Sequence, residues 1–376
     1  MHSVTPKGLA IHGAAALLDP PDGLELARIG TAEVGCGWIG APVPAFDRRG
    51  AHRAHALVSV SAFSLNYRDR ALSLRAARSC PPGSWYVIGS ELAGRVVDVG
   101  AEVTALRPGD RVMIDGAYGP GAPRPWGLPT NHASRQVIPL PAAKLRRVPA
   151  SMPDELAACF SVVAQTSFGM VRRARVKAGE RVLVTAAGSA TALAAISAAG
   201  SAGADVTAVT TSAGHAGVAR AAGARDVAVV CRREDRVRSL GDAGLARPAF
   251  DVVIDPFADV YMSATVPLLR AGGRYVTCGL DDQLETTVAP ERTRQVSLAV
   301  GELANIVIRN VEIIGNCLGS ADDLDRALRA HDEGRFSVPV AAVLTDPPAA
   351  EALRASFGPK AVPGKIAVRY AQPWTP

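Results

Sequence analysis

The sequence predicts an α/β protein in which a doubly wound parallel sheet follows a compact β-rich domain. Three observations predict this: an uncharged stretch of βαβ length, an alternation of strands and helices around it, and short alternating strands before it. The stretch runs for 23 residues between Arg181 and Asp205 without a charged side chain. Buried parallel strands joined by a small-residue helix have this composition. A membrane span is the rival interpretation, but the stretch has too many Gly, Ser and Thr residues and too few large aliphatics.

The first part of the chain has the pattern of strands and turns. From about Leu57 to Arg147, short alternating segments are separated by turns at residues 99–101 and 108–110, which predicts a barrel or sandwich. The region from Gly13 to Ala54 is interrupted by Pro and Gly, and no element can be placed there. Its histidines, His52 and His55, lack the further ligands of a metal site, so a surface turn explains them better.

From Pro153 the pattern changes to alternating helices and strands. A helix begins at residues 153–155, and the segments that follow are RVLVT, an Ala-rich helix, DVTAVT, a helix at 215–224, DVAVV, DVVID, a helix from Val260, and GRYVTCG. This alternation is typical of a doubly wound sheet. A helix at 321–333 and a strand at 365–370 do not continue it, so we expect them to return to the first domain. The expected domains are 1–150, completed by 316–376, and 151–315.

Composition argues against several classes of partner. The 376-residue chain has a net charge of +6, but its charges are interspersed and form no basic block, so we expect no nucleic-acid partner. The six cysteines are scattered singly, which is typical of reduced thiols in a cytoplasmic protein. The N-terminus has no signal-peptide pattern, and we expect no membrane association.

The turn after the first strand of the uncharged stretch is the candidate phosphate-binding loop. A Rossmann turn has the pattern G-x-G-x-x-G, whereas residues 185–192 read TAAGSATA and keep only Gly188. Alanine adopts positive φ only at a cost, so the backbone must turn differently. The hydroxyls of Ser189 and Thr191 could donate to phosphate oxygens or cap the helix. From this motif alone, a nucleotide site and a βαβ unit that binds nothing remain equally open.

The order of motifs resembles the medium-chain dehydrogenase/reductase superfamily over roughly residues 55–370. The matching segments are AFSLNYRD (62–69), GSELAGRVVDVG (89–100), GDRV (109–112), AGERVLV (178–184), DVVID (251–255), LLRAGGRYVTCGL (268–280) and VEIIGNCLGS (311–320). The resemblance implies a chaperonin-10-like (GroES-like) β domain, a Rossmann dinucleotide-binding domain, and an active site in the cleft between them. It also leads us to expect a homodimer.

The resemblance further implies a zinc-independent member. Zinc-dependent members have Cys, His and Cys where this chain has Asn66, Ser90 and the neighbourhood of Val162, and none of these can ligate Zn²⁺. Their structural zinc lobe holds four Cys after GDRV, whereas residues 113–137 contain none. We therefore expect no metal. The chain is similar to quinone oxidoreductases and to enoyl or acryloyl thioester reductases.

Hydride transfer without a metal suits an acceptor that is already activated. The expected reaction is NADPH-dependent reduction of the C=C bond of an enone, quinone or enoyl thioester, on a small or carrier-bound metabolite. Tyr67 is the candidate proton or oxyanion-side donor, and Asn66 a donor to substrate or nicotinamide ribose. An ordinary packed aromatic is an equally open interpretation of Tyr67. Arg68 would be explained by an acidic group on the substrate or by an ion pair with Asp69, and the ion pair is favoured.

The end of the second strand of the βαβ unit predicts NADP(H). No acid stands there to hold ribose hydroxyls, and Thr211, Ser212 and His215 suit a 2′-phosphate. A solvent-exposed His215 in a first helical turn is the alternative. The candidate cofactor contacts are Thr166, Gly188, Ser189, Ala190, Thr191, Thr211, Ser212, His215, Gly279 and Leu280. Trp126 and His132 are candidate substrate contacts from their position alone.

Two other functions remain open. One is a zinc-free dehydrogenase or reductase acting on C–OH/C=O or C=N bonds. The other is a redox-inactive member of the superfamily with another activity, which the glycine-poor loop keeps open. Reduction of enones without oxidation of alcohols would separate the leading function from the first of these.

Overall fold

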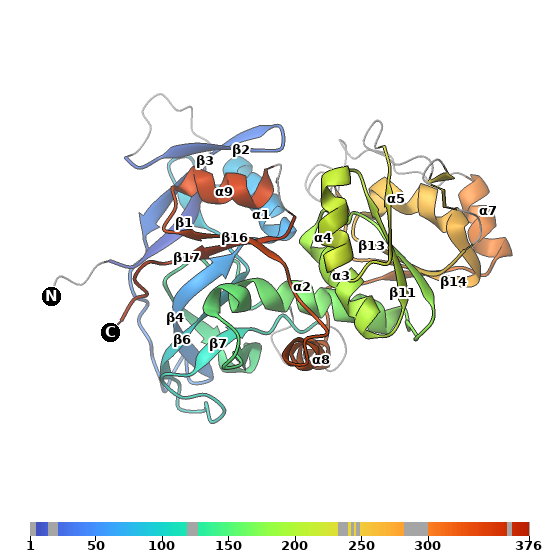
Figure 1. The fold of residues 1–376 in the computed structure, drawn as a ribbon. Helices are drawn as coiled ribbons and strands as arrows, with labels where there is room; N and C mark the ends of the chain where they lie inside the picture. Colours follow the sequence, from blue (N-terminus) through green and yellow to red (C-terminus); the bar gives the residue numbers. More distant parts are fainter. Residues whose placement is uncertain are drawn as a thin grey trace. The chain divides into compact units, whose positions relative to one another are not determined.

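The computed structural model describes residues 5–13, 22–118, 127–231, 240–241, 244–245, 249–281, 300–358 and 363–375. The predicted substrate residue Trp126 lies outside these ranges. By its packing the chain divides into two compact units, one of residues 1–162, 340–361 and 365–376 and the other of residues 163–339 and 362–364. Figure 1 shows unit 1 as the strand-rich part and unit 2 as the part with helices around a sheet. The predicted fold class is confirmed.

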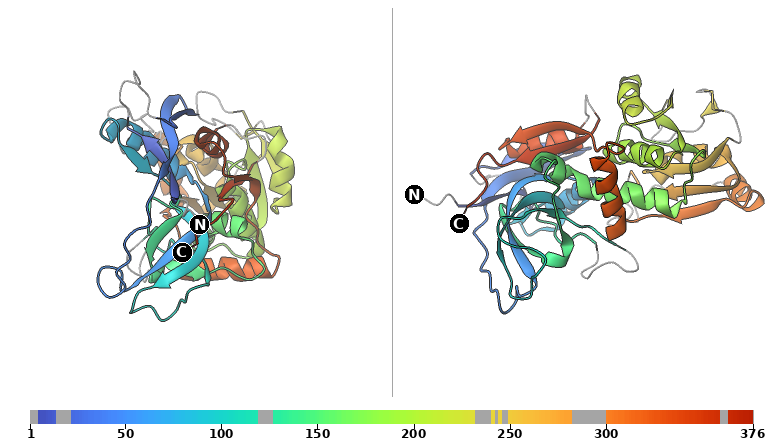
Figure 2. Two further views of the ribbon diagram at one scale, coloured as in Figure 1. Left: turned by 90° about the vertical axis from the view of Figure 1, so that its left-hand side faces the viewer. Right: turned by 60° about the horizontal axis from the view of Figure 1, so that its bottom comes forward.

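Unit 1 contains a seven-stranded sheet in which β16-β17-β4-β6-β7-β9 are neighbours and β8 pairs with β4. Its strands are β4 (His55–Ser64), β6 (Glu91–Val99), β7 (Arg111–Ile114), β8 (Val137–Pro141), β9 (Leu145–Arg147), β16 (Val340–Thr345) and β17 (Lys365–Arg369), with a 3₁₀ turn at Ala142–Lys144. Strand β17 pairs antiparallel with β4, so the red C-terminal strand lies beside a blue N-terminal one (Figure 1, Figure 2). The final strand therefore returns to the first part of the chain, as expected.

A second sheet of unit 1 comes mainly from the region in which no element could be placed. Its order is β2-β3-β1-β5, with β1 (Lys7–His12), β2 (Glu25–Ile29), β3 (Ala32–Gly40) and β5 (Trp85–Val87). Helix α9 (Ala349–Phe357) packs against it, and both carboxylate oxygens of Glu25 accept backbone N–H groups at the start of that helix at 2.9 Å. The carboxylate supplies acceptors to N–H groups that a helix start leaves free.

Helix α1 (Tyr67–Ser79) interrupts a segment that was expected to hold only strands and turns. It begins directly after β4, because Asn66 is extended (φ −107°) and the Asp69 carboxylate accepts the Asn66 backbone N–H at 2.7 Å. This is half of a capping box. Because the alternating pattern of β4 comes directly before α1, the change from a strand period to a helix period is hidden in the sequence. The expectation that this segment holds only strands and turns was therefore wrong.

Unit 2 contains a six-stranded sheet of parallel pairs in the order β12-β11-β10-β13-β14-β15. The strands are β10 (Arg181–Val184), β11 (Asp205–Thr210), β12 (Asp226–Val229), β13 (Phe250–Asp255), β14 (Leu269–Thr277) and β15 (Glu312–Gly315). The helices are α3 (Ala190–Ser201), α4 (Ala216–Ala221), α5 (Ala258–Thr265), α7 (Val300–Ile308) and α8 (Ala321–Asp332), with 3₁₀ turns at Ala213–His215 and Val266–Leu268.

Helices cover both faces of this sheet because successive strand residues point to opposite sides. Val182 and Val184 join the apolar cluster that includes α3, whereas Leu183 between them joins the cluster that includes α5. Strand order reverses between β10 and β13, which makes this the switch point where open parallel sheets bind ligands. No helix among the described residues is long and apolar enough to cross a bilayer.

Helix α2 (Asp154–Arg173) contains the boundary between the two packing units. Within unit 2, the Arg172 guanidinium pairs with Asp323 of α8 at 2.9 Å, and the Gln165 amide donates to the Ser320 carbonyl at 3.2 Å. Residues 316–339 consequently pack with unit 2. The expected domain boundaries at 150/151 and 315/316 differ from these packing units and stay a prediction.

A buried carboxylate joins three strand ends at the switch point. Asp255, the last residue of β13, is fully buried. Its Oδ1 accepts the Thr185 hydroxyl at 2.6 Å and the Phe257 N–H at 2.9 Å, and its Oδ2 accepts the Tyr275 hydroxyl. Burial raises the pKa of Asp255 to about 6, although these hydrogen bonds oppose the shift.

We predict that Asp255→Asn changes how stability depends on pH. The pKa is 3.8 for an unperturbed Asp and about 6 in the folded protein, so the folded state binds more protons between these values. The stability contributed by Asp255 is complete below the lower value and is lost as pH rises through the upper one, by about 3 kcal/mol at most. Urea unfolding from about pH 4 to pH 7 should shift in favour of the variant as pH rises. A gap between the two proteins that does not change with pH would contradict this.

Candidate functional site

The glycine-poor loop of unit 2 turns through a strained alanine. Ala186 has a φ of +54°, the left-handed conformation that glycine usually takes, at a cost of about 1–2 kcal/mol. The backbone thus provides the turn without a glycine at that position. Ser189 is the N-cap of α3, and its hydroxyl accepts the Ala192 N–H at 3.2 Å. Of the two roles considered for Ser189, the structure shows the cap.

The start of α3 has donors suited to a phosphate. The backbone N–H groups of Ala190 and Thr191 have no hydrogen-bond partner within the described residues. They belong to the first turn of a 12-residue helix, where free N–H groups and the helix dipole attract anions. The residues present therefore fit the diphosphate of a dinucleotide.

His215 lies against the only glycine of this loop. A Cβ atom on Gly188 would be 2.4 Å from the His215 Nδ1, so any side chain there would displace the imidazole. The same nitrogen is 3.4 Å from the Thr210 hydroxyl at the end of β11. The loop and the segment predicted to bind the 2′-phosphate are thus brought together, with Thr211 exposed and Ser212 half-buried beside them.

Three further predicted cofactor contacts lie in other parts of unit 2. Gly279 and Leu280 follow β14, and the Gly279 carbonyl accepts the Ala258 N–H at 3.2 Å. Thr166 is buried in α2, and its carbonyl accepts the side-chain amide of Asn316 at 3.4 Å. Asn316, whose N–H also donates to the Thr277 carbonyl at 2.7 Å, was not predicted. Its position directly after β15 at the carboxyl edge of the sheet was the available signal.

In unit 1, a buried carboxylate gathers the residues around the start of α1. Glu91 is fully buried, and its carboxylate accepts five hydrogen bonds. The donors are Ser64 Oγ (3.0 Å), Asn66 Nδ2 (3.2 Å), Lys365 Nζ (3.1 Å), Ser161 Oγ (3.1 Å) and the Val162 N–H (2.8 Å). The resemblance places the zinc ligands of zinc-dependent members at Asn66, Ser90 and the neighbourhood of Val162, and all three positions contact this network.

Lys365 completes the network from the far end of the chain. Its ammonium donates to Asn66 Oδ1 at 2.6 Å and to the Leu65 carbonyl at 3.3 Å. The Asn66 amide also donates to Ser90 Oγ at 3.2 Å, so its oxygen and nitrogen both have partners. Ser90 in turn donates to Asp69 at 2.6 Å. Burial raises the pKa of Asp69, and the hydrogen bonds from Ser90 and Asn66 oppose the shift. Sequence reasoning missed Lys365, which is 299 residues from Asn66.

Arg68 connects the start of α1 to the residue before His132, a predicted substrate contact. Tyr67 is 38% exposed, and its hydroxyl is 3.4 Å from the Arg70 guanidinium. Arg68 Nη2 donates to the Asn131 side-chain oxygen at 2.9 Å. His132 follows, and its Nδ1 is 2.6 Å from the Val87 carbonyl. Because a carbonyl only accepts, Nδ1 carries the proton and the His132 Nε2 is an acceptor when the ring is neutral.

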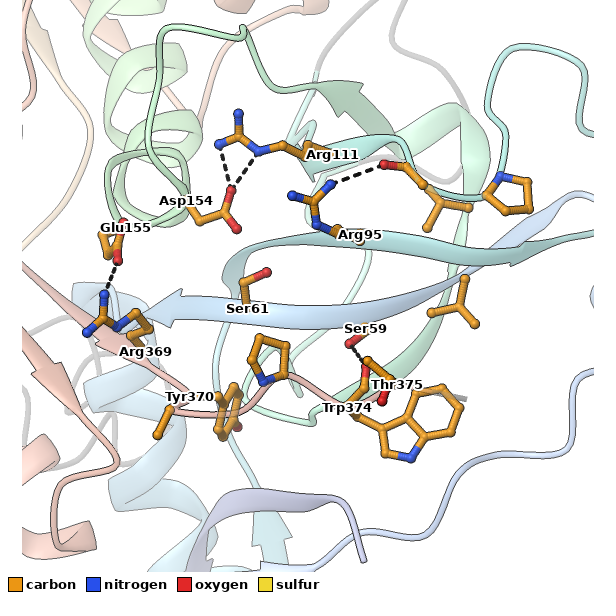
Figure 3. A pocket seen from close by; sticks show the side chains of 16 residues that line it. Ser59, Ser61, Arg95, Arg111, Asp154, Glu155, Arg369, Tyr370, Trp374 and Thr375 are labelled. Atoms are coloured by element: carbon orange, nitrogen blue, oxygen red, sulfur yellow. Dashed lines mark hydrogen bonds and ion pairs between the residues drawn. The ribbon is translucent and has the colours of Figure 1, made fainter. Parts of the chain in front are cut away.

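A separate hollow of about 1060 Å³ in unit 1 contains none of the predicted site residues (Figure 3). Its charged groups are largely paired with one another. Arg111 binds Asp154 at 2.6 Å, and Arg369 binds Glu155 at 2.9 Å. The Ser59 hydroxyl donates to the Trp374 carbonyl at 2.5 Å. These pairs leave few groups for a ligand, so the candidate residues of unit 1 are those at the start of α1, and the candidate residues of unit 2 are those of the α3 loop.

Within the part of the chain that the structure describes, no group of three or more His, Cys, Asp or Glu side chains could hold a metal ion. His52 lies in a turn and His55 begins β4, with their rings 5.5 Å apart. Zinc independence stays a prediction.

Two family models match the chain. Residues 52–129 match the model described as "Alcohol dehydrogenase GroES-like domain", and residues 190–333 match "Zinc-binding dehydrogenase". The matched segments fall in unit 1 and unit 2 respectively. The predicted pairing of a chaperonin-10-like domain with a Rossmann domain is thereby confirmed.

This chain is also similar to curated proteins and to solved structures. Polyketide synthase GfsB of Streptomyces halstedii is 35% identical over 211 residues, which are 55% of this chain and only 3% of that synthase. Acryloyl-coenzyme A reductase of Metallosphaera sedula is 26% identical over 279 residues, 68% of this chain and 75% of the reductase. The 2-octenoyl-CoA carboxylase reductase CinF, solved with NADP and 2-octenoyl-CoA, has a TM-score of 0.73 at 22% identity, covering 98% of this chain and 88% of that one.

The likeness to CinF shows a shared fold alone. Two family matches, one in each unit, together cover more than half of the chain. Each unit has the architecture that its match requires. The chain belongs to the medium-chain dehydrogenase/reductase superfamily of NAD(P)-binding oxidoreductases.

Proposed function

We propose that the protein is a zinc-independent, NADPH-dependent reductase of an activated C=C bond in an enone, quinone or enoyl thioester, on a small or carrier-bound metabolite. The observation that carries this is the network around Glu91 and Lys365. It fills the zinc-ligand positions of the superfamily with an amide, a hydroxyl and a backbone N–H, which are not zinc ligands. A C=C bond conjugated to a carbonyl accepts hydride without a metal, whereas an isolated carbonyl gains more from one.

The residues of unit 1 would handle the proton of this reaction. Bound NADPH supplies the hydride. The hydroxyl of Tyr67, a residue that is 38% exposed, is the proposed donor to the carbanion-like carbon or its oxygen. Both amide hydrogens of Asn66 are used within unit 1, so we propose that Asn66 mainly holds the start of α1. A donor role toward substrate or ribose would require it to give up one of two 3.2 Å bonds.

The donors of unit 2 would hold the cofactor. We propose that the free N–H groups of Ala190 and Thr191 bind the diphosphate, and that Thr211, Ser212 and His215 bind the 2′-phosphate. Gly279, Leu280 and Thr166 remain proposed contacts of the nicotinamide half. The acceptor Nε2 of His132 is the proposed substrate contact, and Trp126 stays a prediction outside the described residues.

We predict that Tyr67→Phe lowers kcat by about 10²–10³-fold with a simple enone or quinone as substrate. Only the hydroxyl is removed, so the ring keeps its packing and its contact with Arg70, whose guanidinium carbon is 5.4 Å from the ring centroid. Stopped-flow oxidation of NADPH measures the loss, and melting temperature and NADPH affinity should stay close to wild type.

Tyr118→Phe is the matched control, because Tyr118 is another exposed tyrosine of unit 1. If kcat of Tyr67→Phe fell by only a few-fold, solvent or another group would supply the proton. Turnover of alcohols or imines in place of enones would support the C–OH/C=O or C=N alternative, and no turnover of any class would support the redox-inactive one.

We predict at least tenfold tighter binding of NADPH than NADH, because one charge-assisted hydrogen bond to the 2′-phosphate contributes about 1.5–3 kcal/mol. Ser212→Asp places a carboxylate at that position and should reverse the preference. Titration of cofactor fluorescence measures both. Equal affinities in the wild type would exclude the proposed role of Thr211, Ser212 and His215.

We propose a homodimer formed through the edge of unit 2. Among the described residues β15 is the last strand of its sheet, and exposed apolar side chains lie on it and on α7, with Val307 73% and Ile308 79% exposed. An apolar patch beside an open strand edge favours association with a second copy. Sedimentation velocity should show dimers for the wild type and for Val43→Asp, an exposed position in unit 1, and monomers for Ile308→Asp. A monomeric wild type at micromolar concentration would exclude this interface.

A further inference from the structure

We propose that the Arg68 guanidinium binds a carboxylate of the substrate, so that the substrate is an alkene bearing an acid group. The proposal rests on the proposed function and adds the charge of the substrate to it. Arg68 follows Tyr67 in the first turn of α1. In this proposal a small substrate reaches both side chains, with its carboxylate at Arg68 and its alkene at the Tyr67 hydroxyl.

Arg68 is a charged group without a full counter-charge. Its Nη2 donates to the neutral amide oxygen of Asn131 at 2.9 Å. The nearest carboxylate oxygen, Asp69 Oδ1, is 3.8 Å from Arg68 Nη1, which is too far for a hydrogen bond. Both of these atoms are buried without any hydrogen-bond partner. The ion pair with Asp69 expected from the sequence is present only at this long distance.

Asp69 is already committed to other partners. Its Oδ2 accepts the Ser90 hydroxyl at 2.6 Å and the Asn66 N–H at 2.7 Å, and the side chain is completely buried. The Arg68 side chain, by contrast, is 37% exposed. Asp69 therefore stabilises the start of the helix, while the Arg68 side chain, apart from its buried Nη1, is partly exposed.

The position of Arg68 is unfavourable for folding alone. The first turn of a helix carries partial positive charge and favours acids, so a cation there is repelled by about 0.3–1 kcal/mol. A residue that opposes a local rule without a compensating contact is a candidate for function. An anionic ligand would reverse the sign of this interaction, because the guanidinium and the helix dipole would then attract the same group.

The chemistry favours a carboxylate. A guanidinium presents a planar fork of N–H donors that matches the two oxygens of a carboxylate. One guanidinium balances one unit of negative charge, whereas a phosphate dianion would stay half neutralised. Asn131 holds the fork in place through Nη2, and His132 follows directly in the chain.

Two probes with the same enone test this proposal: (E)-4-oxopent-2-enoate, which carries a carboxylate, and its neutral methyl ester. For the wild type, kcat/KM should be at least tenfold higher for the acid, as expected for one charge-assisted hydrogen bond. The ratio of the two values should fall to about one in Arg68→Gln. Arg75→Gln is the matched control, because Arg75 is an exposed arginine of the same helix, and it should keep the wild-type ratio.

A binding measurement separates this proposal from the proposed function. Calorimetric titration of 4-oxopentanoate, the saturated acid, should give heat with the wild type and Arg75→Gln and none with Arg68→Gln. If the acid binds in this pattern but neither enone is reduced, the carboxylate subsite stands and the proposed reductase function fails. If both enones are reduced equally well by the wild type, the subsite is excluded and the reductase function stands.

A purely structural role for Arg68 has its own signature. Arg68 would then only connect α1 to Asn131, and Asn131→Ala would lower the melting temperature as much as Arg68→Gln while the wild type showed no preference for the acid. Should Arg68→Gln fail to fold, Arg68→Lys keeps the charge without the fork. It should retain part of the preference for the acid, and an undiminished preference would contradict bidentate recognition.

Discussion

The buried ion pair between Glu91 and Lys365 is the interaction on which unit 1 depends. Removing two charges from water is expensive, and such a pair persists only if further hydrogen bonds satisfy both groups. Glu91 accepts five donors, and Lys365 contacts two more oxygens. The pair joins residues 274 positions apart, at the start of β6 and the start of β17. Loss of one partner would leave a buried charge, which typically costs 3–5 kcal/mol.

The same network determines what the site in unit 1 can do. The network forms hydrogen bonds with both the nitrogen and the oxygen of the Asn66 side-chain amide. It thereby fixes the residue at which α1 begins, and Tyr67 and Arg68 follow directly. Precise positioning of donors is what makes acid catalysis and ligand charge recognition effective. Under the proposed zinc-independent function, proton donors and cations of the chain would carry the chemistry at this position.

The loop before α3 in unit 2 turns by a different route from a glycine-rich Rossmann loop. A strained Ala186 provides the turn, and the Ser189 hydroxyl caps α3. The single glycine allows the close approach of His215, and the first-turn N–H groups of Ala190 and Thr191 have no partner among the described residues. At the adjacent switch point, Asp255 links Thr185 and Tyr275, so the ends of three strands are held together below the loop.

The sequence by itself determined the parallel sheet, the position of the turn between β10 and α3, and the return of the last strand, because strand and helix periods record locally which face is buried. It did not reveal the sheet of β1, β2, β3 and β5, whose strands are short and interrupted by Pro and Gly, or α1, whose start depends on Asp69. The contact of Lys365 with Asn66 and that of His215 with Gly188 were decided only by the tertiary structure. Each joins segments whose approach depends on the path of the whole chain, and no local pattern records that path.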